Sequence, residues 1–182
     1  MTVLDCIKSR RSIRRFTDQP VPEDLLQQVL EAVQYAPSWG NTQCWEIVVV
    51  REQAPKEALA ALLPPKNPAT LAVTHAPLVI AVCGATHKAG FYQGQPVTKF
   101  GDWLLYDLGL ASQNLCLAAH SLGLGTVIVG AFDHDQAKAI LHLPAGYEVV
   151  TLIPVGYPAQ APGAPKRRPV AEFNHSDFFR PR

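Results

Sequence analysis

The chain has 182 residues, of which 48% are hydrophobic and 17% are charged, and its formal net charge is +1. This length predicts one domain with a substantial core, and the composition excludes extensive disorder. The near-neutral charge argues against a general nucleic-acid binder, because such domains carry a strong excess of cations. Residues 1–10 contain no long apolar run before a cleavage site, so we expect no secretory signal and a cytoplasmic protein.

The spacing of cysteines and histidines predicts no metal centre. The four cysteines lie far apart and match no zinc, iron–sulfur or thioredoxin pattern, and the six histidines show no paired ligand spacing. We therefore interpret the cysteines as small buried hydrophobic residues in a reducing compartment.

The first predicted element is a short helix capped by Thr2, and a cluster of cations follows it directly. Residues 8–16 read Lys-Ser-Arg-Arg-Ser-Ile-Arg-Arg-Phe, so five cations surround two hydroxyl groups. Guanidinium groups offer planar, bidentate donors to a phosphate, and Arg10 and Arg14 lie four positions apart with Ser12 between them. We predict a phosphate site here. The alternative for such a cluster is a solvated basic surface that binds nothing.

Residues 22–36 predict an amphipathic helix that ends before Pro37. Pro22 suits the first helical position, and hydrophobic residues recur at three- and four-residue spacing. The turn after this helix carries the carboxamides of Asn41 and Gln43. Carboxamides hold both donors and acceptors and therefore suit the mixed edge of a heterocycle, although isolated ones are also common turn formers.

Alternating strands and short helices are expected next, with strands at 46–50 and 78–83 and helices at 54–63 and 68–75. The segment that follows, residues 85–100, lacks periodicity, and a long irregular loop inside a compact domain is usually functional. We interpret it as a cover on the substrate side. The candidate substrate pocket combines Trp39 with the aromatic residues of this loop, Phe91, Tyr92 and Phe100.

The longest predicted helix, residues 101–122, is apolar on nearly all sides. A membrane span is the alternative, but Asp107 would be costly in lipid, and we expect no membrane association. A central helix buried inside a dimer fits the composition better. A buried Asp107 then needs a partner, which the sequence does not identify.

Glycines at 123 and 125 allow the backbone to approach a flat ligand closely. They follow a helix and precede a strand, which is the wrong order for a Rossmann motif. A helix capped by Asp133 and a strand over 148–156 come next. The Pro- and Gly-rich tail then carries three adjacent cations, Lys166 to Arg168, which are either solvated or brought back to the first cluster.

The order of these motifs along almost the full chain resembles the nitroreductase family of FMN-dependent oxidoreductases. No single motif is decisive, but their order and spacing together are specific. The matching segments are Arg10 to Phe16, Pro20 to Leu26, Ala36-Pro37-Ser38 with Asn41, Gln43 and Trp45, Asp107 with Gln113-Asn114-Leu115, Leu122 to Thr126, Pro154 to Pro158, and Lys166 with Arg168.

The resemblance implies an α+β fold, with a central mixed β-sheet flanked by helices in an intertwined homodimer that binds FMN at the subunit interface. Residues 1–182 are then a single nitroreductase-like FMN-binding domain, and 158–182 form an extended tail that packs on or across the dimer. Chemistry takes place on FMN, so we expect no catalytic side chain, and NADH or NADPH is the expected electron donor.

The resemblance also implies where FMN is held. The N-terminal arginines and Ser12 contact the phosphate, the ribityl chain and the pyrimidine edge, and two tail cations contribute at the phosphate. The turn around Trp39 comes from the other subunit and lies over the flavin ring, while a main-chain segment follows the isoalloxazine. The expected cofactor-binding residues are Arg10, Arg11, Ser12, Arg14, Pro37, Ser38, Trp39, Asn41, Gln43, Thr126, Val127, Ile128, Gly130, Lys166 and Arg168.

Two residues depart from the family pattern. Cys44 stands where the family usually has proline after Asn-x-Gln. We interpret it as a buried thiol, and a redox-active thiol is the alternative. Trp39 occupies a position often held by a small residue, where it is placed to shield the flavin or narrow the pocket. The favoured function is a reductase of nitroaromatics, quinones or a similar small acceptor by a ping-pong mechanism. The alternatives are a family flavoprotein that acts in dehalogenation, flavin breakdown or dehydrogenation, and a non-catalytic dimer that binds a nucleotide or other anion.

Overall fold

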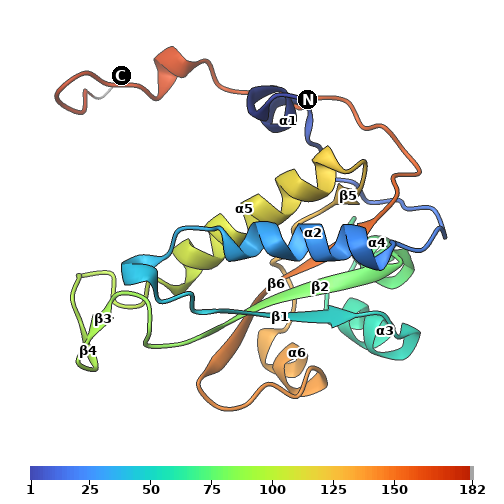
Figure 1. Cartoon of the computed structure of the whole chain (residues 1–182), viewed down its shortest axis with the longest axis horizontal. Helices are drawn as coiled ribbons and strands as arrows, with labels where there is room; N and C mark the ends of the chain where they lie inside the picture. Colours follow the sequence, from blue (N-terminus) through green and yellow to red (C-terminus); the bar gives the residue numbers. More distant parts are fainter. Residues whose placement is uncertain (181–182) are drawn as a thin grey trace.

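A four-stranded sheet with helices on both faces forms the centre of the computed structural model, which describes residues 1–180 (Figure 1). The strand order is β1-β2-β6-β5, and each of these pairs is antiparallel. A parallel bridge between Ser12 and Thr126 adds the N-terminal segment beside β5. A separate hairpin pairs β3 (Phe91–Tyr92) with β4 (Gln95–Pro96). The strands of the main sheet are β1 (Trp45–Val50), β2 (Leu78–Ala85), β5 (Gly125–Thr126) and β6 (Tyr147–Gly156).

The sheet is buried on both faces, which explains why β2 is apolar throughout. Leu78, Ile80 and Val82 pack in the core that includes α2 and α5, whereas the alternate residues of β2 pack in the core that includes α3, α4 and α6. The helices are α1 (Val3–Ser9), α2 (Glu23–Gln34), α3 (Gln53–Ala61), α4 (Thr70–His75), α5 (Leu104–Ser121) and α6 (His134–Ile140), with short 3₁₀ turns η1 (Trp39–Asn41) and η2 (Val170–Glu172).

Helix starts followed the capping chemistry that the sequence predicted. Thr2 forms a capping box with Asp5, and Asp133 accepts a hydrogen bond from the N–H of Gln136. Pro22 is the N-cap of α2 rather than its first helical residue, because its backbone is extended, with ψ 144°.

The helix predicted from residue 101 begins later, at Leu104. Gly101 has a left-handed φ of +67°, and the N–H of Trp103 donates to the carbonyl of Ala89 at 3.0 Å. These residues therefore close the preceding loop instead of extending α5. None of the helices in residues 1–180 combines the length and apolar character that a membrane span requires.

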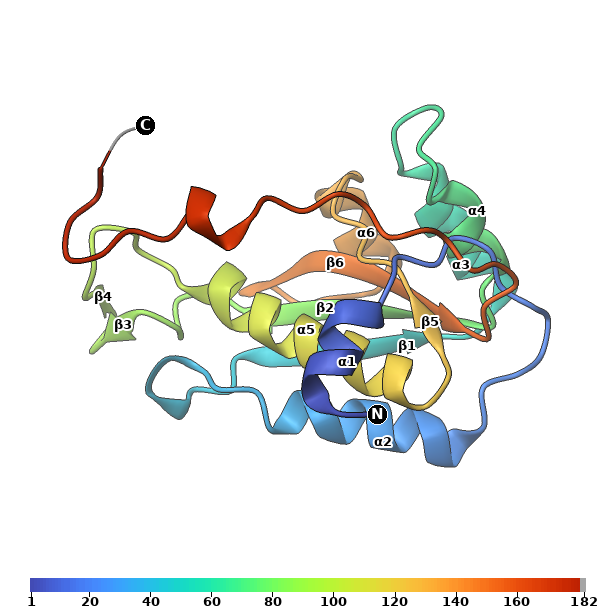
Figure 2. The same ribbon diagram turned by 90° about the horizontal axis from the view of Figure 1, so that it is seen from above.

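The tail after β6 leaves the body of the molecule. In Figure 1 it passes α1 and continues as an extended chain, and the view in Figure 2 shows the same course. Its aromatic residues are largely exposed, at 76% for Phe178 and 78% for Phe179. Such exposed rings are typical of a surface that contacts another chain.

Candidate functional site

Arginines from two distant segments line one cavity of about 250 Å³. Three of them follow α1 directly, and the fourth, Arg167, comes from the tail. The lining residues are Arg10, Arg11, Ser12, Arg14, Pro162, Gly163, Pro165 and Arg167, and we call this space the arginine cavity.

Main-chain pairing places the N-terminal arginines at the edge of the sheet. The N–H of Ile13 donates to the carbonyl of Thr126 at 2.8 Å, next to the parallel bridge of Ser12. A side chain at Gly125 would put its Cβ only 2.7 Å from Cγ1 of Ile13, so this close approach requires glycine. The tail is tied to the same segment, because the N–H of Ala159 donates to the carbonyl of Arg15 at 3.0 Å.

The charge of the arginine cavity is not neutralised by the ion pairs of residues 1–180, which join Arg51 to Glu23, Lys138 to Glu148 and Arg168 to Glu172. Arg11 donates to the carbonyls of Lys8 and Arg10, at 2.7 and 2.8 Å, and so shapes the segment itself.

The donors of this cavity fit a phosphate. The Nε of Arg14 is buried and has no hydrogen-bond partner within the described residues. A buried donor without a partner is costly, and several guanidinium groups around one space suit an anion with several acceptor oxygens. The phosphate of FMN therefore fits the residues present.

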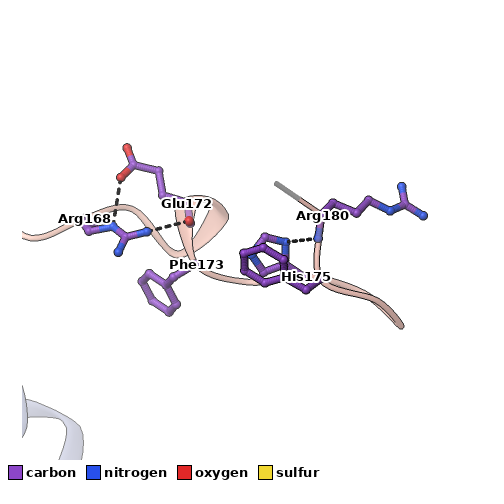
Figure 3. A pocket seen from close by; sticks show the side chains of 6 residues that line it. Arg168, Glu172, Phe173, His175 and Arg180 are labelled. Atoms are coloured by element: carbon purple, nitrogen blue, oxygen red, sulfur yellow. Dashed lines mark hydrogen bonds and ion pairs between the residues drawn. The ribbon is translucent and has the colours of Figure 1, made fainter. Parts of the chain in front are cut away.

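The tail cations are arranged differently from the prediction. Arg168 is committed to its own segment, with Nε 3.4 Å from Glu172 Oε2 and a second bond of 2.8 Å to the Glu172 carbonyl (Figure 3). Lys166 is exposed and does not line the arginine cavity. Arg167, which belongs to the predicted tail cluster but not to the predicted cofactor-binding residues, does line it. No sequence signal identified Arg167, because three adjacent cations in an irregular segment have no periodicity that fixes their directions.

A larger cavity, of about 690 Å³, is formed by the tail alone and is drawn in Figure 3. Its lining residues all lie between 168 and 180, and none is an N-terminal arginine. We assign it no catalytic role.

The predicted main-chain segment runs along the sheet edge beyond Ser12. Thr126 and Val127 are buried, whereas Ile128 and Gly130 are exposed. Val129 is held to β6 by two main-chain hydrogen bonds with Leu152, both of 2.9 Å. The exposed residues of this segment therefore offer a surface that continues from Thr126, the residue that pairs with Ser12.

The turn predicted to cover the flavin lies at the other end of the molecule. Within this turn, Pro37, Asn41 and Gln43 are exposed, and the N–H of Trp39 donates to Asp107 in the first turn of α5. The arginines instead lie near His120, in the last turn of α5. In Figure 1 the light-blue turn before β1 and helix α1 accordingly lie near opposite ends of α5. One chain therefore does not bring the two predicted parts of the site together.

Asp107 has the partner that the sequence left open, and the aromatic residues nearby form a stacked group. The ring centroids of Trp39 and Trp103 are 5.0 Å apart, and those of Phe100 and Trp103 are 6.3 Å apart. Trp103, which was not predicted, thus links Trp39 to Phe100. Phe91 packs instead on His87, and Tyr92 is exposed on the β3–β4 hairpin, so neither joins this group.

The chain is similar to known proteins over most of its length. The model of the nitroreductase family matches residues 7–157. An NADH dehydrogenase from Thermus thermophilus is 35% identical over 182 residues, covering 87% of each chain. An FMN reductase [NAD(P)H] from Bacillus subtilis is 29% identical over 188 residues, covering 97% of this chain and 74% of the relative.

Among solved structures, the NADPH:FMN oxidoreductase from Vibrio harveyi complexed with NAD+ is similar, with a TM-score of 0.81 and 26% identity. The match covers 98% of this chain and 78% of that one. With a family model spanning most of its length, the chain belongs to the nitroreductase family of oxidoreductases.

Proposed function

We propose that the chain is an FMN-dependent NAD(P)H oxidoreductase that passes electrons to a small organic acceptor, such as a nitroaromatic or a quinone. The observation that carries this proposal is the arginine cavity, where the buried Nε of Arg14 has no partner within residues 1–180. A phosphate monoester supplies both the charge and the acceptor atoms that this donor set needs. The FMN reductase of Bacillus subtilis and the NADPH:FMN oxidoreductase of Vibrio harveyi support the same assignment.

The residues of this chain would bind and orient the cofactor rather than react. Arg10, Ser12, Arg14 and Arg167 would hold the phosphate end, and the exposed edge at 128–130 would lie along the ring system. FMN, when bound, supplies the hydride and electron transfer, so no nucleophile or acid–base pair is required of the protein. The protein's part is to fix the ring, place donors at its polar edge and keep one face open to donor and acceptor in turn.

A homodimer completes the site in this proposal. Asp107 accepts the hydrogen bond of the Trp39 N–H, and His120 lies near Arg10. These two residues are 13 positions apart on α5, which corresponds to about 20 Å at a rise of about 1.5 Å per residue. The Trp39 of one chain would therefore cover the flavin held by the arginines of the other. Exposed apolar residues on α1, α5 and the tail support such an interface: Val3, Leu4, Ile7, Leu105, Tyr106, Phe173, Phe178 and Phe179.

We propose further that residues 1–182 act as one FMN-binding domain and that 158–182 pack on or across the dimer. Within the described part of this tail, Pro162 to Arg167 covers the arginine cavity before the chain continues past α1 (Figure 1). The tail would thus serve both the cofactor site and the interface. Residues 181 and 182 lie outside the described residues.

The direct test is a visible spectrum of the purified chain, followed by anaerobic addition of NADH and NADPH in turn and then of a nitroaromatic or a quinone. A ping-pong mechanism predicts that the nicotinamide bleaches the flavin absorbance without acceptor, and that the acceptor restores it without nicotinamide. Both half-reactions are required, because donor and acceptor use the same open face.

Two results would contradict the proposal. A protein that stays colourless after mixing with FMN and gel filtration does not bind the cofactor. A yellow protein that neither nicotinamide reduces is not an NAD(P)H oxidoreductase, and a binding protein or a flavoprotein with another reaction would then be the better description.

A further inference from the structure

The turn formed by Ser38 to Gln43, which we call the Trp39 turn, has an unusual backbone. Gly40 has φ +51°, and two residues with side chains, Asn41 and Gln43, have φ +56° and +46°. Residues other than glycine adopt this left-handed region at an energetic cost, so the surrounding structure must hold them there. Inside the turn, the N–H of Gln43 donates to Ser38 Oγ at 3.0 Å and that of Thr42 donates to the Trp39 carbonyl at 2.9 Å.

One anchor from outside the turn is the carboxylate of Asp107. The N–H of Trp39 lies 3.0 Å from one carboxylate oxygen and 3.2 Å from the other. The thiol of Cys44 lies 3.8 Å from Oδ2 of the same group. Asp107 is only 1% exposed, and burial raises the pKa of its carboxyl group. A polar group this deeply buried is expected to have a specific partner, and the Trp39 N–H is that partner.

A second anchor is the indole of Trp103, which packs against the indole of Trp39 with centroids 5.0 Å apart and planes tilted by 44°. Trp103 is itself fixed, because its Nε1–H donates to Thr98 Oγ1 at 2.8 Å and its main-chain N–H donates to the carbonyl of Ala89. Aromatic pairs at this distance are favourable beyond the area that they bury.

We propose that Asp107 and Trp103 are positioning residues that fix Trp39 by its backbone and by its ring, so that the Trp39 turn is held ready to cover the flavin of the partner subunit. The effect on FMN binding rests on the proposed function, whereas the contacts of Asp107 and Trp103 with Trp39 do not. A loose turn would have to be ordered each time FMN binds, which lowers affinity, whereas a fixed one is already ordered. The buried acid of the apolar helix α5 is thereby given a role in cofactor binding.

Two substitutions of similar size separate the acceptor role of Asp107 from simple packing. Asp107→Asn keeps one oxygen for the Trp39 N–H, whereas Asp107→Leu fills the space and keeps no acceptor. Ser112→Ala is the matched control, because Ser112 is buried on the same helix and its hydroxyl has no hydrogen-bond partner within residues 1–180.

The contacts can be read by ¹⁹F NMR of the full chain labelled with 5-fluorotryptophan. Its three tryptophans, Trp39, Trp45 and Trp103, give three signals, which single Trp→Phe variants assign. We expect Asp107→Leu to shift or broaden the Trp39 signal while the Trp45 signal on β1 reports an intact fold. Asp107→Asn should restore the Trp39 signal, and Ser112→Ala should leave it in place.

An unchanged Trp39 signal in folded Asp107→Leu overturns the proposal, as does equal disturbance by Asp107→Asn and Asp107→Leu. Should Asp107→Leu fail to fold, hydrogen exchange of the Trp39 amide in the wild-type chain decides instead. Slow exchange supports the bond, and exchange at the rate of an open peptide overturns it.

The consequence for the cofactor is measured separately, by FMN titration of the same variants. We expect Asp107→Leu to weaken FMN binding by about tenfold, which is the upper end of what one ordinary hydrogen bond contributes, and Asp107→Asn to recover most of that loss. If the wild-type chain binds no FMN, the proposed function fails while the NMR result still decides the anchoring. If FMN binds wild type and Asp107→Leu equally well, the positioning role fails alone.

Discussion

The hydroxyl of Ser9 lies 2.8 Å from Nε2 of His120, joining the last residue of α1 to the last turn of α5. This contact places Arg10 and Arg11 beside the imidazole. Burial, and then the charges of these two arginines, lower the pKa of His120. The pKa of His120 is therefore sensitive to the net charge at the arginine cavity.

We predict that the pKa of His120 lies below its ordinary value of 6.5 and rises when phosphate or FMN binds, because the anion offsets the arginine charges. An NMR titration of the imidazole signals with and without inorganic phosphate measures this shift. Arg10→Ala should raise the pKa without any ligand, and Arg51→Ala, whose partner is Glu23, serves as the control. If neither phosphate nor FMN changes the pKa of His120, no anion binds beside Arg10 and Arg11.

Arg14→Ala is expected to weaken FMN binding by about 1.5 to 3 kcal/mol for each charge-assisted hydrogen bond lost. The reason is that the buried Nε of Arg14 has no hydrogen-bond partner within residues 1–180, so a bound ligand would supply one. Quenching of flavin fluorescence gives the affinity, and riboflavin, which lacks the phosphate, is the matched ligand. An equal loss for FMN and riboflavin would mean that Arg14 acts on something other than the phosphate.

The tail offers a comparison between neighbouring cations. Arg167→Ala should weaken FMN binding more than Arg168→Ala, because Arg167 lines the arginine cavity while Arg168 is paired with Glu172 and lies over the ring of Phe173. The same titration with FMN and riboflavin measures both variants, with Lys166→Ala as the exposed reference. The opposite ranking would support the assignment of Lys166 and Arg168 that was made from sequence.

The sequence predicted local features well and distant pairings poorly. Capping by Thr2 and Asp133 depends on neighbours within three residues, so it was readable from the order of residues. The partner of Asp107 was not, because Trp39 lies 68 positions away and donates through its main chain, which any residue except proline can do. Arg167 was left out of the predicted site because an irregular segment gives no rule for which of three adjacent cations lines the cavity.

Asp107 also gives a prediction for the pH dependence of stability. Burial raises the pKa of this carboxyl above its ordinary value of 3.8, with Asp102 adding to the shift and the donors of Trp39 and Cys44 opposing it. Between pH 3.8 and the raised pKa, the unfolded chain has released this proton while the folded chain still holds it. The free energy of unfolding therefore falls as the pH rises across this range. Urea unfolding across this range should therefore show wild type losing stability relative to Asp107→Asn.

Asp5 provides the control of opposite sign for this experiment. Hydrogen bonds from Thr2 lower the pKa of Asp5, so its contribution appears as the pH rises and is lost as the pH falls through the lowered value. Wild type should therefore gain stability relative to Asp5→Asn as the pH rises from the lowered pKa to 3.8, which is below the range in which Asp107 acts. A difference between wild type and Asp107→Asn that stays constant with pH would show that burial does not perturb this carboxyl.

The two-subunit site can be tested by complementation between defective chains. Arg14→Glu reverses the charge at the proposed phosphate site. Trp39→Ala removes the indole proposed to cover the flavin ring, but it keeps the main-chain N–H that donates to Asp107. Each homodimer has two damaged sites and should bind FMN weakly. A heterodimer, however, combines the intact Arg14 of one chain with the intact Trp39 of the other and so contains one complete site.

If the two variants are unfolded together and refolded at equal amounts, random pairing makes heterodimers about half of all dimers, so about one quarter of all sites are intact. Titration of the mixture should therefore show that fraction of sites with wild-type affinity. The separately refolded variants, mixed only afterwards, control for incomplete damage. A site built within one chain predicts no recovery, because every site in every dimer then carries one of the two substitutions.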